Sequence, residues 1–437
     1  MNRSHVTVAL ARRPAWPAVG VAFLAAVLVF AGCSKQDSRD LQPGIYRATV
    51  ELPGGKPVPF GLDVAQEEKG KVLYVVNGAE RIRLDELKLA PGTFEARFPG
   101  YETVLQGRVS GDELNGEVLL PHAKGKLLKL PFKAKLGESW RFFAEALPNN
   151  ADFAGRWSVT FTDQSQGRVP GVAQFDQSFE RVSGTVQLPD ADQRYLAGEA
   201  HDEELKLSRF DGGAVVLYEA KLDAQGQLVG TMWTDRGGAR RFVAKRDADA
   251  TIDPVALATQ LRNPAEPFRF AFRDLDGSTV ASDDPRFKDK VLLVSLAGSW
   301  CPNSHDEAAL LVALDRKYRD QGLRIVSLMF EQHADFDNAV RAVQRFRGAA
   351  GIDYPTLIAG EADKAKASAA LPQLEAVVAF PTAIFIDRTG LVRKIHTGFA
   401  GPATGVRHDV VARDFELEIE ALLAPAAEGS PAAAISP

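Results

Sequence analysis

The hydrophobic pattern of the chain changes near residue 250, and this change constrains the fold more than any other sequence feature. Before it, from Gly44 to about Arg246, short apolar runs are separated by Gly, Pro, Asn and Asp. Turn residues recur roughly every ten residues, which is typical of an all-β sandwich or barrel. The clearest predicted strands are 46–52, 71–76, 103–109, 113–120 and 127–134.

This first half consists of two copies of one unit, offset by roughly 110 residues, long enough for each copy to be a small domain. Gly44 opens one copy and Gly155 the other, and each copy closes with a basic-aromatic strand, at 131–134 and 241–244. We predict two antiparallel, lipocalin-like β domains, at 43–146 and 147–247, whose edges closure would remove.

Within these copies we single out one turn and four aromatic residues. The segment 210–214, Phe-Asp-Gly-Gly-Ala, predicts a hairpin turn, because Asp-Gly-Gly supplies the positive φ angles that such turns need. Core packing is the favoured interpretation of the aromatics over ligand stacking. They are Trp140, Trp157, Tyr195 and Trp233.

After a charged, Pro-containing linker at 248–266, strands alternate with helices from 267 to 424. The run 291–297 is almost continuously apolar, as expected of a parallel strand covered on both faces. We predict an α/β domain here, and a disordered low-complexity tail at 425–437. Its other strands are predicted at 323–330, 355–358, 380–386 and 391–396, and its helices at 306–318, 334–346 and 409–423.

The segment between the first strand and first helix of this domain contains Cys301, followed by Pro302. Free backbone N–H groups and the helix dipole stabilise a thiolate at a helix start, and move its pKa from about 8.5 toward or below neutrality. A proline suits the first turn, where no N–H donor is needed. The position therefore predicts that Cys301 is a nucleophile.

The order of these motifs resembles a known family. Strand, Trp300-Cys301-Pro302, helix, and later Phe380-Pro381-Thr382 before an apolar strand are similar to the exported TlpA/ResA-like thiol-disulfide oxidoreductases of the redoxin group. The resemblance implies a thioredoxin fold over about the last 160 residues, with Pro381 as a cis-proline facing the thiol. It also implies that Trp300, Pro302, Pro381 and Thr382 contact substrate.

Glu307 stands where these proteins carry an acidic residue near the site. The resemblance implies a proton acceptor that tunes Cys301, and the alternative is a solvated first-turn carboxylate. His305 is adjacent to the motif, and a solvent-facing histidine is the favoured interpretation there.

Ser304 departs from the family, which has its second cysteine at this place. A serine hydroxyl cannot resolve a mixed disulfide, so ordinary dithiol reduction is not available to this chain alone. Three hypotheses remain: a monothiol oxidoreductase resolved by an external thiol, a catalytically degenerate scaffold, and a one-cysteine peroxidase. The peroxidase fits least, because Val294 and Gly298 occupy the Pro and Thr/Ser places of a peroxide-binding loop.

The N-terminus has the order of a signal peptide: Arg3, Arg12 and Arg13 precede an apolar run at 18–31. The run ends in Phe30-Ala31-Gly32-Cys33, which resembles a bacterial lipobox. We expect a signal peptide at 1–32, acylation of Cys33, a tether at 33–42 and a periplasmic, lipid-anchored protein, with the outer membrane favoured by Ser34. The alternative is an ordinary secretory signal with an incidental cysteine.

The composition limits the classes of partner that we expect this chain to bind. The net charge of -5 argues against nucleic acid. Of the 2 cysteines, Cys33 is assigned to the anchor, which leaves Cys301 as the one thiol of the mature chain. His396 and His408 have no carboxylate at ligand spacing, so we expect no metal and no cofactor. The expected partners are disulfide-bearing proteins and low-molecular-weight thiols.

Overall fold

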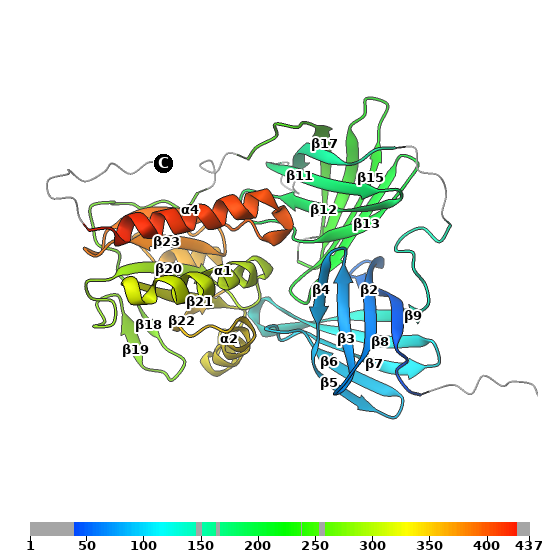
Figure 1. Cartoon of the computed structure of the whole chain (residues 1–437), viewed down its shortest axis with the longest axis horizontal. Helices are drawn as coiled ribbons and strands as arrows, with labels where there is room; N and C mark the ends of the chain where they lie inside the picture. The colour runs from blue at the N-terminus through cyan, green and yellow to red at the C-terminus, as the bar shows by residue number, and fades with distance from the viewer. Residues whose placement is uncertain (1–38, 146–150, 163–166, 237, 253–257, 426–437) are drawn as a thin grey trace, which may run out of the picture. The chain divides into compact units, whose positions relative to one another are not determined.

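The computed structural model describes residues 39–145, 151–162, 167–236, 238–252 and 258–425. The predicted signal peptide, Cys33 and nearly all of the predicted tail lie outside these residues. Among the described residues, no helix is both long and apolar enough to span a membrane. These residues form three sheets (Figure 1).

The first sheet is antiparallel, in the order β4-β3-β2-β1-β9-β8-β7-β6-β5. Side chains alternate along β1, where Tyr46, Ala48 and Val50 are buried. The sheet stays open between β4 and β5. Its strands are β1 (Gly44–Leu52), β2 (Lys56–Glu67), β3 (Gly70–Asn77), β4 (Glu80–Arg83), β5 (Asp85–Ala90), β6 (Thr93–Arg97), β7 (Val104–Ser110), β8 (Glu113–His122) and β9 (Lys126–Leu136), with a short 3-10 turn, η1 (Ala123–Gly125), before β9.

The second sheet is a closed antiparallel barrel in which β10 pairs with both β11 and β17. Both β domains are therefore antiparallel, as predicted, and the second removes its edges completely. The predicted turn at Asp211–Ala214 joins β14 to β15, with Gly212 at φ +88. The strands are β10 (Gly155–Thr162), β11 (Arg168–Ser178), β12 (Arg181–Gln187), β13 (Leu196–His201), β14 (Glu204–Phe210), β15 (Val215–Leu222), β16 (Leu228–Thr234) and β17 (Gly238–Arg246).

The C-terminal sheet is mixed, in the order β19-β18-β22-β21-β20-β23-β24. All residues of β20 are buried, and β20 runs parallel to β21 and antiparallel to β23. This is the predicted thioredoxin-type fold. Its strands are β18 (Ala271–Arg273), β19 (Thr279–Ala281), β20 (Val291–Ala297), β21 (Leu323–Glu331), β22 (Thr356–Glu361), β23 (Thr382–Ile386) and β24 (Val392–Thr397). Its helices are α1 (Pro302–Tyr318), α2 (Phe336–Ala350), α3 (Lys364–Ala370) and α4 (Val406–Leu423), with 3-10 turns η2 (Arg319–Gln321) and η3 (Pro402–Thr404).

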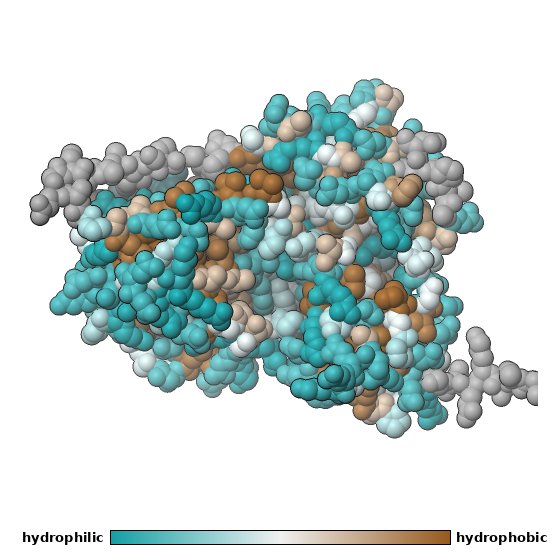
Figure 2. Space-filling view, in the orientation of Figure 1, coloured by the Kyte–Doolittle hydropathy of each residue, from teal (hydrophilic) through white to brown (hydrophobic). Residues whose placement is uncertain are grey.

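Alternate residues of β20 face two different cores. Val291 and Leu293 pack with side chains of α1, α2 and α4. Leu292, Val294 and Leu296 pack on the opposite face, in the cluster that also contains Cys301. The outer side of α4 carries the exposed apolar residues Val406, Val410 and Leu417, and Figure 2 shows apolar surface along this helix.

Several segment limits differ from the predictions. Helix α1 begins at Pro302 rather than at residue 306, and neither α3 nor the hairpin β18–β19 was predicted. Leu41, assigned to the tether, is buried in the first core. Leu261, assigned to the linker, bridges Leu374 and packs in the C-terminal domain. Short or apolar-poor segments have too few residues to show a periodicity, and only their tertiary contacts reveal them.

Candidate functional site

Cys301 is the N-cap residue of α1, directly after the buried strand β20. Its carbonyl accepts a hydrogen bond from the Ser304 amide at 3.0 Å, and Pro302 is the first helical residue. The fixed φ of proline starts the helix immediately after the thiol. The structure therefore confirms the prediction that the sulfur lies at the start of a helix.

The loop before β23 meets this thiol. The peptide bond between Phe380 and Pro381 is cis, and the Cys301 thiol donates to the Phe380 carbonyl at 3.3 Å. The hydroxyl of Thr382, the first residue of β23, donates to the Ala379 carbonyl at 2.9 Å. The structure thus brings together two motifs that lie 79 residues apart in sequence.

Burial dominates the electrostatics of the sulfur. Cys301 is 7% exposed, and burial raises the pKa of its thiol above the usual range. Hydrogen bonds from the Ser304 amide and hydroxyl and the charge of Arg236 oppose this rise without cancelling it. The predicted lowering of the Cys301 pKa is wrong for this arrangement, because a low-dielectric environment disfavours the thiolate more than the helix start favours it.

Ser304 is buried one turn into α1, and its hydroxyl accepts from the Gly298 amide at 3.4 Å. Trp300 is held beside the thiol by a hydrogen bond from its indole N–H to the Phe330 carbonyl at 2.8 Å. Its ring packs edge-on against Phe380, with centroids 6.1 Å apart. Trp300 and Phe380 therefore pack in the same hydrophobic cluster as Cys301.

Glu307 is not a solvated carboxylate, so that alternative is wrong. Its side chain is buried under β20, where one carboxyl oxygen accepts from the Ser295 hydroxyl at 2.5 Å. The other oxygen has no hydrogen-bond partner among the described residues. Burial raises the pKa of Glu307 to about 8, so the group is mostly a neutral acid at pH 7.

A second buried acid, which the sequence analysis missed, lies at the end of β21. Glu331 accepts from the Ser299 amide at 2.9 Å and from the Ser299 hydroxyl at 2.6 Å, and burial raises its pKa to about 7. Ser299 is two residues before Cys301. An acidic residue at the carboxyl end of an apolar parallel strand was the signal that would have revealed it.

His305 is not solvent-facing either. Its ring stacks on Tyr101 of the first sheet, with centroids 4.0 Å apart, and one ring nitrogen lies 2.8 Å from the Ser299 carbonyl. Burial lowers the pKa of His305 to about 4, so the ring is neutral at pH 7. A neutral ring held in this way supports the active-site turn rather than supplying a charge to it.

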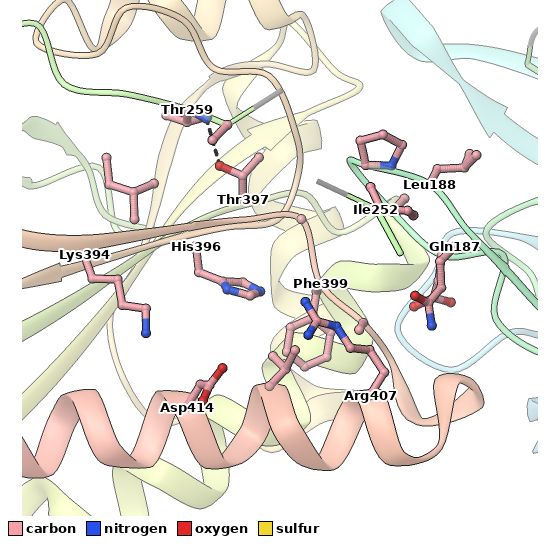
Figure 3. Close-up of a pocket in the computed structure, with 18 of the residues that line it drawn as sticks. Gln187, Leu188, Ile252, Thr259, Lys394, His396, Thr397, Phe399, Arg407 and Asp414 are labelled. Carbon is pink, nitrogen blue, oxygen red and sulfur yellow. Dashed lines mark hydrogen bonds between the residues drawn. The ribbon is translucent and has the colours of Figure 1, made fainter. Parts of the chain in front are cut away.

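A separate cavity of about 760 Å³ lies next to β24 and the first turns of α4. Figure 3 shows His396, Arg407 and Asp414 around it, with Leu188 and Gln187 of the second barrel opposite. Its lining includes residues on both sides of the undescribed segment 253–257 and does not include Cys301. We therefore assign it no part in thiol chemistry. Within the described ranges, no three His, Cys, Asp or Glu residues gather in a metal-binding arrangement.

Comparison with known proteins agrees with this geometry. Residues 261–408 match the family Redoxin. The thiol-disulfide oxidoreductase ResA of Bacillus thuringiensis subsp. konkukian is 27% identical over 123 residues, which is 28% of this chain and 62% of the relative. The ResA of Halalkalibacterium halodurans is 25% identical over 129 residues, 30% of this chain and 65% of the relative. The chain thus spans less than two thirds of these relatives.

Two solved structures are similar to part of this chain. A thiol:disulfide interchange protein of the thioredoxin family from Chlorobium tepidum TLS is 19% identical, covering 37% of this chain and 99% of its own, with a TM-score of 0.28. A DsbF homologue from Corynebacterium diphtheriae is 19% identical, covering 39% and 98%, with a TM-score of 0.30. The sheet order, the cis-proline facing the thiol and the family match together make residues 261–408 a redoxin domain.

Proposed function

We propose that the chain exchanges thiols and disulfides through Cys301 alone. The observation that carries this proposal is the sulfur at the start of α1, within 3.3 Å of the carbonyl that precedes the cis-proline. A nucleophilic thiol beside the edge of an extended loop can receive a disulfide whose backbone lies along that loop. The Redoxin match and the ResA similarity support the same chemistry.

The reaction has two exchange steps. The Cys301 thiolate attacks one sulfur of a disulfide, the sulfur–sulfur bond breaks, and the leaving thiolate takes the proton that Cys301 lost. An external thiol, from a small molecule or a partner protein, then attacks the mixed disulfide as its thiolate. This regenerates Cys301 and releases a new disulfide. Ser304 takes no part in the second step, since oxygen forms no stable bond to sulfur here.

Glu307 is proposed to accept the proton of Cys301, the role that the resemblance implies. Burial keeps most of this acid neutral at pH 7, so the fraction of Glu307 able to accept a proton grows as pH rises toward about 8. Trp300, Pro302, Pro381 and Thr382 are proposed to contact the substrate, because they adjoin Cys301 in sequence or belong to the cis-proline loop.

We further propose that the chain works in the cell envelope, anchored through acylated Cys33. The basic and apolar order of residues 1–32 and the lipobox-like Ala31-Gly32-Cys33 support this location. Two acyl chains anchor a protein stably without a membrane-spanning helix. Metabolic labelling with an alkyne fatty acid should mark the wild type and not Cys33→Ser.

Capture of mixed disulfides tests the exchange chemistry. Envelope extract from cells expressing the chain is quenched in acid, alkylated, and separated without reductant. We expect adducts that reductant dissolves and that Cys301→Ala abolishes. Ser304→Cys supplies the missing resolving thiol, so adducts should fall and disulfide reductase activity should appear. A lack of adducts in the wild type together with no activity in Ser304→Cys would refute the exchange function.

The burial of Cys301 favours one second candidate, a catalytically degenerate redoxin domain that serves as a binding scaffold. An inert thiol would keep a high pKa in every state of the chain. The rate of alkylation by a small reagent would then show its inflection at or above about pH 8.5, and Ser304→Cys would remain inactive. An inflection well below that pH would exclude the scaffold.

A further inference from the structure

Two hairpin loops of the second barrel lie against the turn that holds the thiol. Gly213, between β14 and β15, packs so closely that a Cβ at this position would be 2.7 Å from the Pro302 ring. Arg236, between β16 and β17, donates to the Trp300 carbonyl at 3.2 Å and to the Gly213 carbonyl at 2.8 Å. Its guanidinium lies 4.7 Å from the centre of the Trp300 ring.

The segment between β12 and β13 of the same barrel holds the first turn of α1. Asp192 accepts from the Asn303 side-chain amide at 3.0 Å and from the Gly401 amide at 2.6 Å. Arg194 donates to both carboxyl oxygens of Asp306, at 2.9 and 3.0 Å. A bidentate arginine–carboxylate contact sets orientation as well as distance.

Arg194 also connects the two β domains to this turn. It pairs with Asp211 of the second barrel at 2.9 Å and with Glu80 of the first sheet at 3.0 Å. The Arg194 side chain is 12% exposed, and its three carboxylate partners are exposed by 9% or less. The largely buried Arg194 guanidinium therefore pairs with carboxylates from all three domains at the N-terminal end of α1.

The first sheet contributes further contacts, two of which lie close to the turn. Tyr101 stacks on His305, as described above, and Glu102 lies 2.7 Å from a ring nitrogen of His333, which follows β21. Together the β domains contact five residues of the turn. They are Trp300, Pro302, Asn303, His305 and Asp306.

We infer that the two β domains form a cover over the active-site turn, and that the cover must move away before a protein disulfide can reach Cys301. The pocket lined by Tyr101, Gly213, Arg236 and Trp300 has a volume of about 20 Å³, room for about one water molecule. This inference rests on the proposed function only in that the exposed thiol then exchanges with a disulfide.

The contacts between the β domains and the active-site turn are compatible with a cover that opens. They are mainly ion pairs and hydrogen bonds, and water can solvate their polar groups once the domains separate. Polar contacts between domains of one chain are commonly transient, whereas large apolar ones are not. Opening also returns solvent to the sulfur, which removes the burial that raises the pKa of Cys301.

Two reagents of different bulk test the inference on the full chain. Cys301 is labelled with a small maleimide and with a polyethylene-glycol maleimide, and both rates are normalised to those of a free cysteine peptide. In the wild type we expect the bulky reagent to be at least about tenfold slower than the small one after this normalisation, because only the open fraction admits it. Equal normalised rates would overturn the inference.

Two substitutions should open the cover by different means. Asp306→Asn removes the negative charge that pairs with Arg194, and Gly213→Ala inserts a methyl group against the Pro302 ring. Each should raise the bulky-reagent rate about tenfold or more, by increasing the open fraction. The matched controls are Asp284→Asn, whose ion pair with Arg286 lies within the redoxin domain, and Gly348→Ala, which has open space around it.

The outcomes separate the cover from the chemistry. If both variants keep the wild-type unfolding midpoint and also the wild-type bulky-reagent rate, the cover does not limit access and the inference is wrong. If the variants label faster but form no mixed disulfide with oxidised glutathione, the cover stands and the exchange function fails. If they label faster and also exchange faster, both proposals are supported.

Discussion

The contact between the two β domains has an aromatic centre in addition to polar contacts such as the Arg194–Glu80 ion pair, whereas their contact with the redoxin domain is mainly polar. Between the two β domains, Phe210 of the second barrel is fully buried and packs against Phe60 and Phe98 of the first, with ring centroids 5.1 and 4.9 Å apart. Between the β domains and the redoxin domain, the main contacts are the ion pairs of Arg194 and the hydrogen bonds of Asp192 and Arg236. The first contact is suited to permanence and the second to opening.

The difference follows from how each contact responds to water. Aromatic side chains exposed by separation gain no new partners, so the apolar contact loses its whole hydrophobic stabilisation. Charged groups exposed by separation recover their hydration, which offsets most of the lost pairing. The two β domains should therefore move together as a unit.

The largest effect is expected at the apolar contact. Phe210→Ala should lower the free energy of unfolding by about 3–5 kcal/mol, because it removes a buried ring that both β domains share. Urea denaturation followed by tryptophan fluorescence measures it. Phe179→Ala is the matched control in the same barrel, since Phe179 is 87% exposed and should contribute less than about 0.5 kcal/mol. Equal losses from both variants would contradict the assignment.

The next largest effect is expected in the pH dependence of the unfolding free energy, through an acid in the redoxin core. Because the pKa of Glu307 is raised to about 8 from a usual 4.5, the unfolded chain loses this proton first, and stability falls as pH rises from about 5 to 8. Glu307→Gln should remove a pH dependence on the order of 3 kcal/mol from the unfolding free energy. Urea midpoints at pH 5 and pH 8 give the comparison.

Glu307→Gln should leave the apolar contact between the β domains unaffected, and Phe210→Ala in turn should leave the pH slope unchanged. A variant at Glu307 that kept the wild-type pH slope would show that this acid is not the titrating group. Glu331, with a pKa of about 7, would then be the next residue to neutralise.

The smallest effect is expected at the rim of the polar contact. The Glu102 hydrogen bond raises the pKa of His333, so this pair stabilises the closed cover below about pH 6.5 and stops doing so as pH rises through the raised value. Both groups are partly exposed, and the pair should contribute less than about 1 kcal/mol. Glu102→Gln should speed bulky labelling of Cys301 at pH 6 by about threefold at most, and not at pH 9.

The sequence predicted the helix start at Cys301 and the cis-proline loop, but not the surroundings of these elements. Trp300-Cys301-Pro302 and Phe380-Pro381-Thr382 predicted the helix start and the cis-proline because local backbone rules govern both. The environments of Glu307 and His305 were predicted wrongly. Burial depends on segments distant in sequence, and a single carboxylate or imidazole gives no local sign of it.

The sequence by itself determined two antiparallel β domains, a redoxin domain, and a thiol at Cys301 with serine rather than cysteine at position 304, because periodicity and motif order are properties of neighbouring residues. Tertiary structure alone decided that this thiol is buried and covered. The contacts that cover it join Asp192 to Asn303 and Arg194 to Asp306, pairs 111 and 112 residues apart. These pairings depend on how the folded domains pack against each other, and no local sequence pattern predicts that packing.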